Sequence, residues 1–183
     1  MIHSMNVKGN NRSVARTQAL LKQGLTELMT EKPVQNITVK ELTDYVNLNR
    51  GTFYLHYKDI FDLLEHMEND LLDEFLQINH AHSAVEMNGK PYPLLYDLFK
   101  FLKKNQNFVR LVLVTIQEQK FVSKLKKILR ERMQNDWNRI FANADPVLCE
   151  IYSAYVRSGC MGVIENWLET SAIQSPADLA RYM

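Results

Sequence analysis

The sequence holds few of the features that mark secreted, membrane or metal-binding proteins. Its 183 residues include two cysteines, Cys149 and Cys160, which stand eleven positions apart and form no CxxC pattern. No apolar run approaches the ~18 to 20 residues of a membrane span, and the first residues (MIHSMNVKGNNRSV) lack the apolar segment of a signal peptide. We therefore expect a cytoplasmic protein in which both cysteines are reduced, small core residues.

Motifs of catalysis are also missing. The chain contains no GxSxG, HExxH, P-loop or GxGxxG, the patterns that accompany common nucleophilic, metal and nucleotide chemistry. His80 and His82 are candidates for metal ligands, but no third ligand stands nearby at a fixed spacing, so a solvated loop is the preferred interpretation. We expect no enzyme activity, no metal and no cofactor.

Alternating strand patterns are missing as well. Apolar residues recur instead at spacings of three and four, which is typical of amphipathic helices. The fold class that we expect is all-α. The predicted helices cover about 12–31, 38–46, the stretch from 50, the stretch from 59, then 93–104, 107–116, 119–142, 146–171 and a short segment that begins at Ser175-Pro176.

Charge is distributed unevenly although the net charge is only +1. Residues 1–60 carry eight basic and five acidic residues, a net +3, and the remainder carries fourteen basic and sixteen acidic residues, a net −2. A basic head on an acidic body indicates that only one end of the chain meets a polyanion. The asymmetry is small and decides nothing alone.

Two local signals shape the first helices. Gly24 interrupts the first helix at a cost of ~1 kcal/mol relative to Ala, which close approach of a neighbouring helix would explain. The stretch Thr38-Val39-Lys40-Glu41 is a capping box: the Thr38 hydroxyl would accept from the Glu41 amide, and the Glu41 carboxylate would accept from the Thr38 amide.

The next helix begins only a few residues after that one ends. Asn47 suits a sharp turn, because asparagine visits the left-handed conformation more readily than most residues. Asn49 is a good N-cap, so a second short helix is predicted from Arg50. Two short helices joined by such a turn form a helix-turn-helix motif.

The stretch NRGTFYLHYKD (49–59) mixes aromatic and charged residues because it has two faces. Phe53 is predicted to anchor the inner face, backed by Leu48 and Tyr57. The outer face would meet DNA, with base contacts from the amino end and phosphate contacts beyond it. The predicted base contacts are Arg50, Gly51 and Thr52, and the predicted phosphate contacts are Tyr54, His56 and Lys58.

Residues 12–66 resemble the DNA-binding domain of the TetR family of transcriptional regulators. The matching signature is ITVKELTDYVNLNRGTFYLHYKDIFDLL, in which ITVKEL and GTFYLHYKD are the most specific parts. The resemblance implies DNA contacts from Thr38, Arg50, Gly51, Thr52, Tyr54 and His56. The complete set of DNA-binding residues that we predict is Thr38, Lys40, Asn49, Arg50, Gly51, Thr52, Tyr54, His56 and Lys58.

The sequence departs from the family pattern at two positions. Ile60 stands where the family usually has a lysine that meets a phosphate, so one such contact would be missing. Replacing Ile60 by lysine is therefore expected to tighten DNA binding. Asn47 replaces the usual turn glycine, a change that we expect to be benign.

The carboxy-terminal half is similar to a subgroup of these regulators, the kind that resembles the activator of dihydroxyacetone kinase genes. Shared features are two helical glycines, a Trp-Leu-Glu stretch and a Ser-Pro helix start. We expect a DNA-binding domain over 1–60 and a helical dimerisation and effector-binding domain over 61–183. Helix 146–171 would pair with its two-fold mate, although packing inside one subunit is the alternative. The predicted interface residues are Tyr155, Gly159, Gly162, Val163 and Trp167.

Effector recognition leaves fewer traces in the sequence. Aromatic residues are candidates for pocket walls, but at helical spacing they are more often plain core: Phe99, Phe101, Phe108, Trp137, Phe141 and Tyr152. A basic run on helix 119–142 is most simply a solvated face with neighbouring acidic residues: Lys120, Lys124, Lys126, Lys127, Arg130 and Arg132.

The function that the resemblance implies is a homodimeric, operator-binding transcriptional regulator, a repressor that recognises an inverted repeat in double-stranded DNA. Its larger domain would respond to a small-molecule effector that the sequence does not identify. The alternative is a co-regulator that is controlled by a protein partner instead of a small molecule.

Overall fold

In the computed structural model, the described residues are 3–82, 92–115, 119–140 and 145–183. Over these ranges the chain forms helices and no strand, which confirms the all-α class. None of these helices is both long and apolar enough to cross a bilayer. The chain divides into two compact units, Met1–Asp70 and Leu71–Met183.

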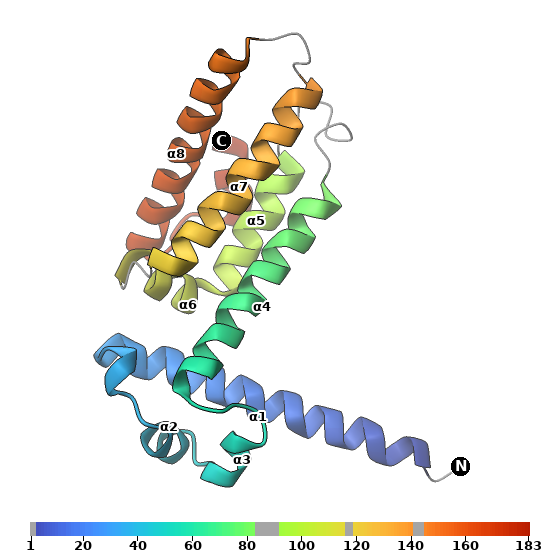
Figure 1. The fold of residues 1–183 in the computed structure, drawn as a ribbon, viewed down its shortest axis with the longest axis vertical. Coiled ribbons are helices and arrows are strands. Elements are labelled where there is room, and N and C mark those ends of the chain that lie inside the picture. Colours follow the sequence, from blue (N-terminus) through green and yellow to red (C-terminus); the bar gives the residue numbers. More distant parts are fainter. Residues whose placement is uncertain (1–2, 83–91, 116–118, 141–144) are drawn as a thin grey trace. The chain divides into compact units, whose positions relative to one another are not determined.

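The first unit contains the predicted helix-turn-helix (Figure 1). Its elements are α1 (His3–Glu31), the 3-10 helix η1 (Val34–Asn36), α2 (Val39–Tyr45), α3 (Arg50–Tyr54) and the first half of α4 (Ile60–Ala81). The helix α1 begins at His3 instead of near residue 12, because the sequence before residue 12 contains no proline that would stop it.

The close approach predicted at Gly24 is confirmed. A Cβ atom on Gly24 would lie 2.3 Å from Cγ1 of Val46 and 3.1 Å from Cδ1 of Leu42. Beside this contact the Tyr45 hydroxyl donates to Oε2 of Glu27 at 3.0 Å, and this hydrogen bond raises the pKa of Tyr45. The end of α2 is therefore held directly against α1.

The cap of α2 forms as predicted on one side only. Oγ1 of Thr38 accepts from the amide of Glu41 at 3.2 Å. The Glu41 carboxylate pairs with Nζ of Lys32 instead of returning to the Thr38 amide, and this hydrogen bond lowers the pKa of Glu41. The carboxylate prefers a cation because a charge-assisted hydrogen bond is stronger than one to a neutral amide.

The division between the units falls inside α4, ten residues after the predicted boundary at 60/61. The first turns of α4 pack on the helix-turn-helix unit. The ring of Tyr57 meets that of His66 edge-on with centroids 5.4 Å apart, and Lys22 of α1 forms an ion pair with Asp70. These contacts explain why residues up to Asp70 belong to the first unit.

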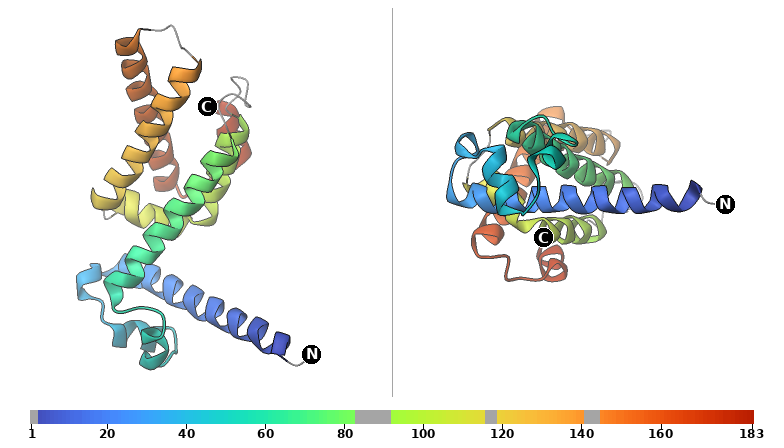
Figure 2. Two further views of the ribbon diagram at one scale, coloured as in Figure 1. Left: turned by 45° about the vertical axis from the view of Figure 1, so that its right-hand side comes forward. Right: turned by 90° about the horizontal axis from the view of Figure 1, so that it is seen from below.

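The second unit is a helical bundle built from the rest of α4 and five further α-helices. These are α5 (Tyr92–Lys104), α6 (Gln106–Arg110), α7 (Gln119–Ile140), α8 (Pro146–Glu169) and α9 (Pro176–Tyr182), and α6 continues into a π-helical stretch, η2 (Leu111–Thr115). Helix α9 packs along α5, and α7 runs beside α8 (Figures 1 and 2).

An aromatic pair lies in the core of the second unit. Trp167 of α8 is 1 % exposed and meets Phe99 of α5 edge-on, with ring centroids 5.3 Å apart. Its Nε1 donates to the carbonyl of Gln174 at 3.2 Å, so the buried indole is also satisfied as a donor. The chain after α8 is thereby tied back to the core.

Gly24→Ala tests the contact between α1 and α2. We expect it to lower the free energy of unfolding by ~1 to 2 kcal/mol, because overpacking (~1 to 3 kcal/mol) outweighs the better helix propensity of alanine (~1 kcal/mol). Urea denaturation measures the change. Val46→Ala removes the nearest atom, so Gly24→Ala made in that background should cost much less. An equal loss in both backgrounds would contradict the contact.

Candidate functional site

The turn before α3 has the conformation that the sequence predicts. Asn47 has a φ of 54°, in the left-handed region. Asn49 caps α3, since its Oδ1 accepts from the amide of Gly51 at 2.8 Å. The amide of Leu48 donates back to the carbonyl of Thr43 at 2.8 Å and closes the turn. The start of α3 is thus fixed by local hydrogen bonds.

The inner face of α3 is aromatic. Phe53 is fully buried, and its ring centroid lies 5.8 Å from that of Tyr57, which is also buried. Tyr54 meets the edge of Phe53 at 5.5 Å, although its own side chain is exposed. The anchor predicted at Phe53 is therefore present, with Tyr57 behind it.

All nine residues predicted to contact DNA are accessible. Thr52 and His56 are half-buried, and the other seven are exposed: Thr38, Lys40, Asn49, Arg50, Gly51, Tyr54 and Lys58. They come from α2, from α3 and from the segment that follows α3. The surface is chemically suited to DNA because it offers guanidinium, ammonium, hydroxyl and imidazole donors without a carboxylate among them.

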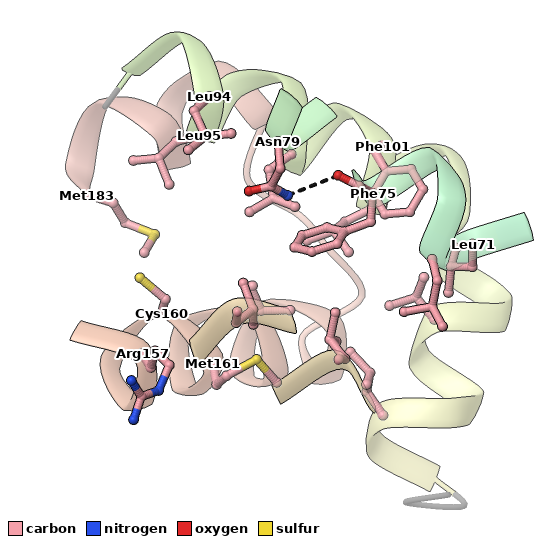
Figure 3. A pocket seen from close by; sticks show the side chains of 18 of the residues that line it. Leu71, Phe75, Asn79, Leu94, Leu95, Phe101, Arg157, Cys160, Met161 and Met183 are labelled. Atoms are coloured by element: carbon pink, nitrogen blue, oxygen red, sulfur yellow. Dashed lines mark hydrogen bonds between the residues drawn. The ribbon is translucent and has the colours of Figure 1, made fainter. Parts of the chain in front are cut away.

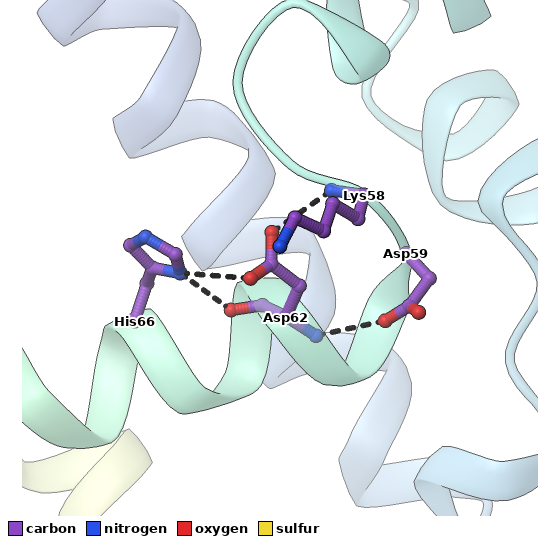
Figure 4. A network of polar contacts seen from close by, with 4 residues as sticks. All are labelled: Lys58, Asp59, Asp62 and His66. Atoms are coloured by element: carbon purple, nitrogen blue, oxygen red, sulfur yellow. Dashed lines mark hydrogen bonds and ion pairs between the residues drawn. The ribbon is translucent and has the colours of Figure 1, made fainter.

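A polar network fixes the backbone where this surface ends (Figure 4). The amide of Lys58 donates to Oδ2 of Asp62 at 2.8 Å, and the amide of Asp62 donates to Oδ1 of Asp59 at 2.8 Å. Nδ1 of His66 donates to the carbonyl of Asp62 at 2.7 Å. Asp59 is thus the N-cap of α4, which the pattern Asp-x-x-Asp indicated but which the sequence analysis missed.

The structure corrects the expectation for Ile60. Its side chain is 4 % exposed and belongs to the core of the first unit, whereas that of Phe61 is 54 % exposed. A lysine at position 60 would have to place its ammonium in apolar surroundings. Position 60 therefore supports packing in this chain, and Ile60→Lys is not expected to tighten binding.

Leu55 is an apolar residue of this surface that the sequence analysis missed. It is 80 % exposed at the carboxy-terminal cap of α3, directly after Tyr54. An exposed leucine beside polar donors suits apolar contact with a thymine methyl group or a deoxyribose. The sequence did contain a signal for this exposure. Leu55 stands two residues from Phe53 and two from Tyr57, and when both of those face the core, the residue midway between them faces away from it.

One face of α8 is apolar and uncovered in the second unit. Gly159 and Gly162 continue this face, and a Cβ atom on either would meet nothing within 4 Å. Among the described residues, no neighbouring side chain of the subunit packs closely on these glycines. The exposed apolar residues recur at spacings of three and four: Val147, Leu148, Ile151, Tyr152, Tyr155 and Val156.

Two of the five predicted interface residues face inward to different degrees. Trp167 is in the core, so the structure removes it from the candidate interface. Val163 is half-buried and packs against the same core. Tyr155 is 76 % exposed and fully available to a partner. The tryptophan was misplaced because its ring packs against Phe99 in the core, a contact with another helix that the sequence does not show.

A cavity of about 320 Å³ lies in the second unit (Figure 3). Among its described lining residues, only Asn79, Arg157 and Cys160 carry a polar side chain. Phe101 lines it, as predicted for one of the aromatic candidates. The other walls are aliphatic or aromatic and include Leu71, Leu72, Phe75, Leu98 and Ile164.

The other aromatic candidates whose side chains the structure describes do not line the cavity. Phe99 and Phe108 pack in or against the core, and Tyr152 is exposed on α8. The side chain of Trp137 and all of Phe141 lie outside the described residues. Three of the four described candidates, Phe99, Phe101 and Phe108, therefore lie in or against the core, the alternative that burial statistics favoured.

The two histidines of the predicted loop, His80 and His82, are not part of a set of metal ligands among the described residues. Nε2 of His82 lies 2.8 Å from Oδ2 of Asp97, and His80 is exposed at the end of α4. No group of three His, Cys, Asp or Glu residues is arranged for a metal ion in the described part of the chain.

The comparison with known families identifies the chain. Residues 89–183, just over half of its length, match the TetR-family model described as the transcriptional regulator C-terminal region. The chain belongs to the TetR family of transcriptional regulators. It is a transcription factor and not an enzyme.

The chain is also similar to one curated regulator over most of its own length. The chain is 23 % identical over 169 residues to the uncharacterized HTH-type transcriptional regulator YxbF of Bacillus subtilis (strain 168). The match covers 90 % of this chain and 43 % of YxbF. The chain therefore spans less than half the length of that relative.

Two solved structures show the same fold. The dihydroxyacetone kinase operon activator DhaS is 14 % identical, with 91 % of this chain and 90 % of that chain covered and a TM-score of 0.56. A TetR transcriptional regulator from Streptococcus agalactiae 2603V is 18 % identical, with 96 % of each chain covered and a TM-score of 0.60.

The different roles of positions 60 and 61 in this TetR-family regulator can be tested directly. Ile60→Lys should lower the free energy of unfolding by ~2 to 3 kcal/mol, because it replaces a buried apolar side chain with a charge. The matched control Phe61→Lys, at an exposed position, should change it by no more than about 0.5 kcal/mol. Equal losses in urea denaturation would show that position 60 is not buried.

Proposed function

We propose that the chain is a repressor that binds an inverted-repeat DNA operator as a homodimer and changes its DNA affinity when a small molecule occupies the cavity. One helix-turn-helix would read each half-site. The observation that carries the proposal is the division of α3 into a buried aromatic face and an exposed polar amino end.

The amino end of α3 is suited to base recognition. Arg50 can donate to the two acceptors of a guanine in the major groove, and Thr52 can offer a methyl group or a hydroxyl to several bases. Gly51 adds no side chain, so the backbone can approach the bases. Because Phe53 fixes the rotation of the helix, these three residues are presented together at its amino end.

Residues that flank the amino end would hold the DNA backbone. Thr38 and Lys40 of α2 are exposed, as are Tyr54 and Lys58 on the other side of the reading residues. Hydroxyl and ammonium donors contact phosphates without reading sequence, and they set the register of the protein on the duplex. The net charge of +3 over residues 1–60 favours such contacts.

The uncovered face of α8 supports the homodimer. An exposed apolar stripe on a monomer is a common sign of an interaction surface. Its spacing suits helix-on-helix packing, and Gly159 and Gly162 leave room for a close partner. A two-fold dimer also presents two reading heads, as an inverted repeat requires.

The cavity favours a small molecule over a protein as the effector. Its volume of about 320 Å³ lies at the lower end of the range of small-molecule sites. It is lined by both α4 and α8. A ligand that shifts α4 would act on a helix whose first turns belong to the DNA-binding unit, which gives the ligand a route to operator affinity.

Arg50→Ala tests base recognition. We expect a loss of ~1 to 3 kcal/mol in operator affinity and a relaxed preference at one base pair of each half-site, because a bidentate contact to one base is removed. Lys58→Ala is the control, since a phosphate contact should weaken all sequences equally. Fluorescence anisotropy on a panel of single-base operator variants measures both. Uniform loss for Arg50→Ala would make it a phosphate contact instead.

Tyr155→Glu tests the dimer. Each copy would bring a carboxylate into the apolar face of α8, and two like charges would lie near the two-fold axis. We expect the variant to sediment as a monomer while the unmodified chain sediments as a dimer. Tyr182→Glu is the matched control, because Tyr182 is 77 % exposed but lies on α9. A Tyr155→Glu protein that stays dimeric would place the interface elsewhere.

A further inference from the structure

The polar groups of the cavity are unequal in what they can offer a ligand (Figure 3). Nδ2 of Asn79 donates to the carbonyl of Phe75 at 2.9 Å, so one of its two amide hydrogens is already used within α4. Burial raises the pKa of the Cys160 thiol, which keeps the thiol neutral near pH 7. Arg157 is the only charged side chain among the described lining residues.

Arg157 has no carboxylate partner in the described part of the chain. The observed ion pairs join other residues, and no hydrogen bond to its guanidinium is present among the described side chains. In Figure 3 Arg157 lies at the edge of the cavity, one turn before Cys160 on the same helix, and its guanidinium points away from the Cys160 thiol. A half-buried guanidinium beside an apolar cavity is stabilised more by an anionic partner than by a neutral one, because the hydrogen bond to an anion is charge-assisted.

A second hollow lies beside the cavity and is lined by residues of α7 and α8. It has a volume of about 630 Å³ and shares Leu129, Arg157 and Met161 with the cavity. The cations along it are Lys126, Lys127, Arg130 and Arg157, against one carboxylate, that of Glu165. We call it the basic groove.

The cations of the basic groove are only weakly neutralised. Nζ of Lys127 lies 3.9 Å from Oε1 of Glu131, at the limit of an ion pair, and both side chains are largely exposed. Such exposed pairs contribute little. The sequence favoured a solvated face for this basic run. That the basic groove shares lining residues with an apolar cavity is information that only the structure provides.

We propose that the effector is an amphipathic anion, whose aliphatic chain fills the cavity and whose carboxylate or phosphate head binds Arg157 and faces the basic groove. The inference rests on the proposed function, since it names the chemical class of the ligand for the same site. A neutral apolar ligand would leave Arg157 desolvated without a partner, and a cationic ligand would be repelled by the four basic side chains.

Calorimetry on the full chain tests this class with three series of saturated ligands, kept below the concentrations at which micelles form. These are n-alkyl carboxylates, n-alkyl phosphates and n-alcohols of equal chain length. We expect about a fourfold gain in affinity per added methylene until the cavity is full. At equal length an anion should bind at least ~10-fold tighter than the alcohol, because its head makes a charge-assisted hydrogen bond.

Variants assign the head group. Arg157→Gln should weaken the anions ~10-fold or more and leave the alcohols unchanged, whereas the exposed control Arg110→Gln on α6 should change neither. Lys126→Gln combined with Lys127→Gln distinguishes the two sources of the anion. Phosphates that lose more affinity than carboxylates would place a phosphate head in the basic groove, and an equal small loss would favour the carboxylate.

Alkylation of Cys160 tests whether the aliphatic chain of the ligand occupies the cavity. In a Cys149→Ser protein, the bound anion should slow the reaction of Cys160 with iodoacetamide, because the thiol lines the cavity. Anions and alcohols of equal affinity, an Arg157→Gln protein with unchanged affinity, or unprotected Cys160 at saturation would each overturn the inference.

DNA binding is measured separately, so the two proposals can fail independently. A chain that binds a specific operator but none of the anions refutes only the ligand class. A chain that binds the anions with the expected pattern but no DNA refutes the proposed function and leaves the ligand class standing.

Discussion

The position of α3 depends on the close contact between α1 and the end of α2. Gly24 lets α1 approach Val46 so closely that a Cβ atom would lie 2.3 Å from Cγ1 of that valine. Val46 directly precedes the left-handed turn at Asn47, and α3 begins only three residues after the turn. The position of α2 on α1 therefore determines where Arg50 and its neighbours are presented. That position depends on Gly24, because a Cβ atom there would collide with Val46.

The same separation of apolar and polar chemistry recurs at each candidate surface. On α3 the buried ring of Phe53 fixes a helix whose other side is polar. On α8 Trp167 is buried in the core, whereas Tyr155 is exposed and two glycines have open space around them. In the cavity one guanidinium borders apolar walls. Each surface can be recognised as a candidate site because it carries residues that the stability of the fold does not require.

Local signals allowed the helix-turn-helix to be predicted almost completely. The cap at Thr38, the turn at Asn47 and the cap at Asn49 act over two or three residues, so sequence alone reveals them. Burial is set by distant neighbours, and there the predictions failed. Ile60 was taken to occupy a phosphate-contact position and Trp167 a dimer interface, although tertiary packing buries both. The cavity was invisible for the same reason, because its walls come from helices far apart in the sequence.

Selection of bound sequences from random duplex DNA tests the central claim most directly, namely that α3 reads bases as one of two symmetric heads. Half-sites of DNA-binding dimers of this kind lie about one helical turn or a multiple of it apart. The account predicts that the recovered DNA contains an inverted repeat with a fixed spacing between its half-sites. Recovery of a single half-site, or of no enriched sequence at all, would contradict it.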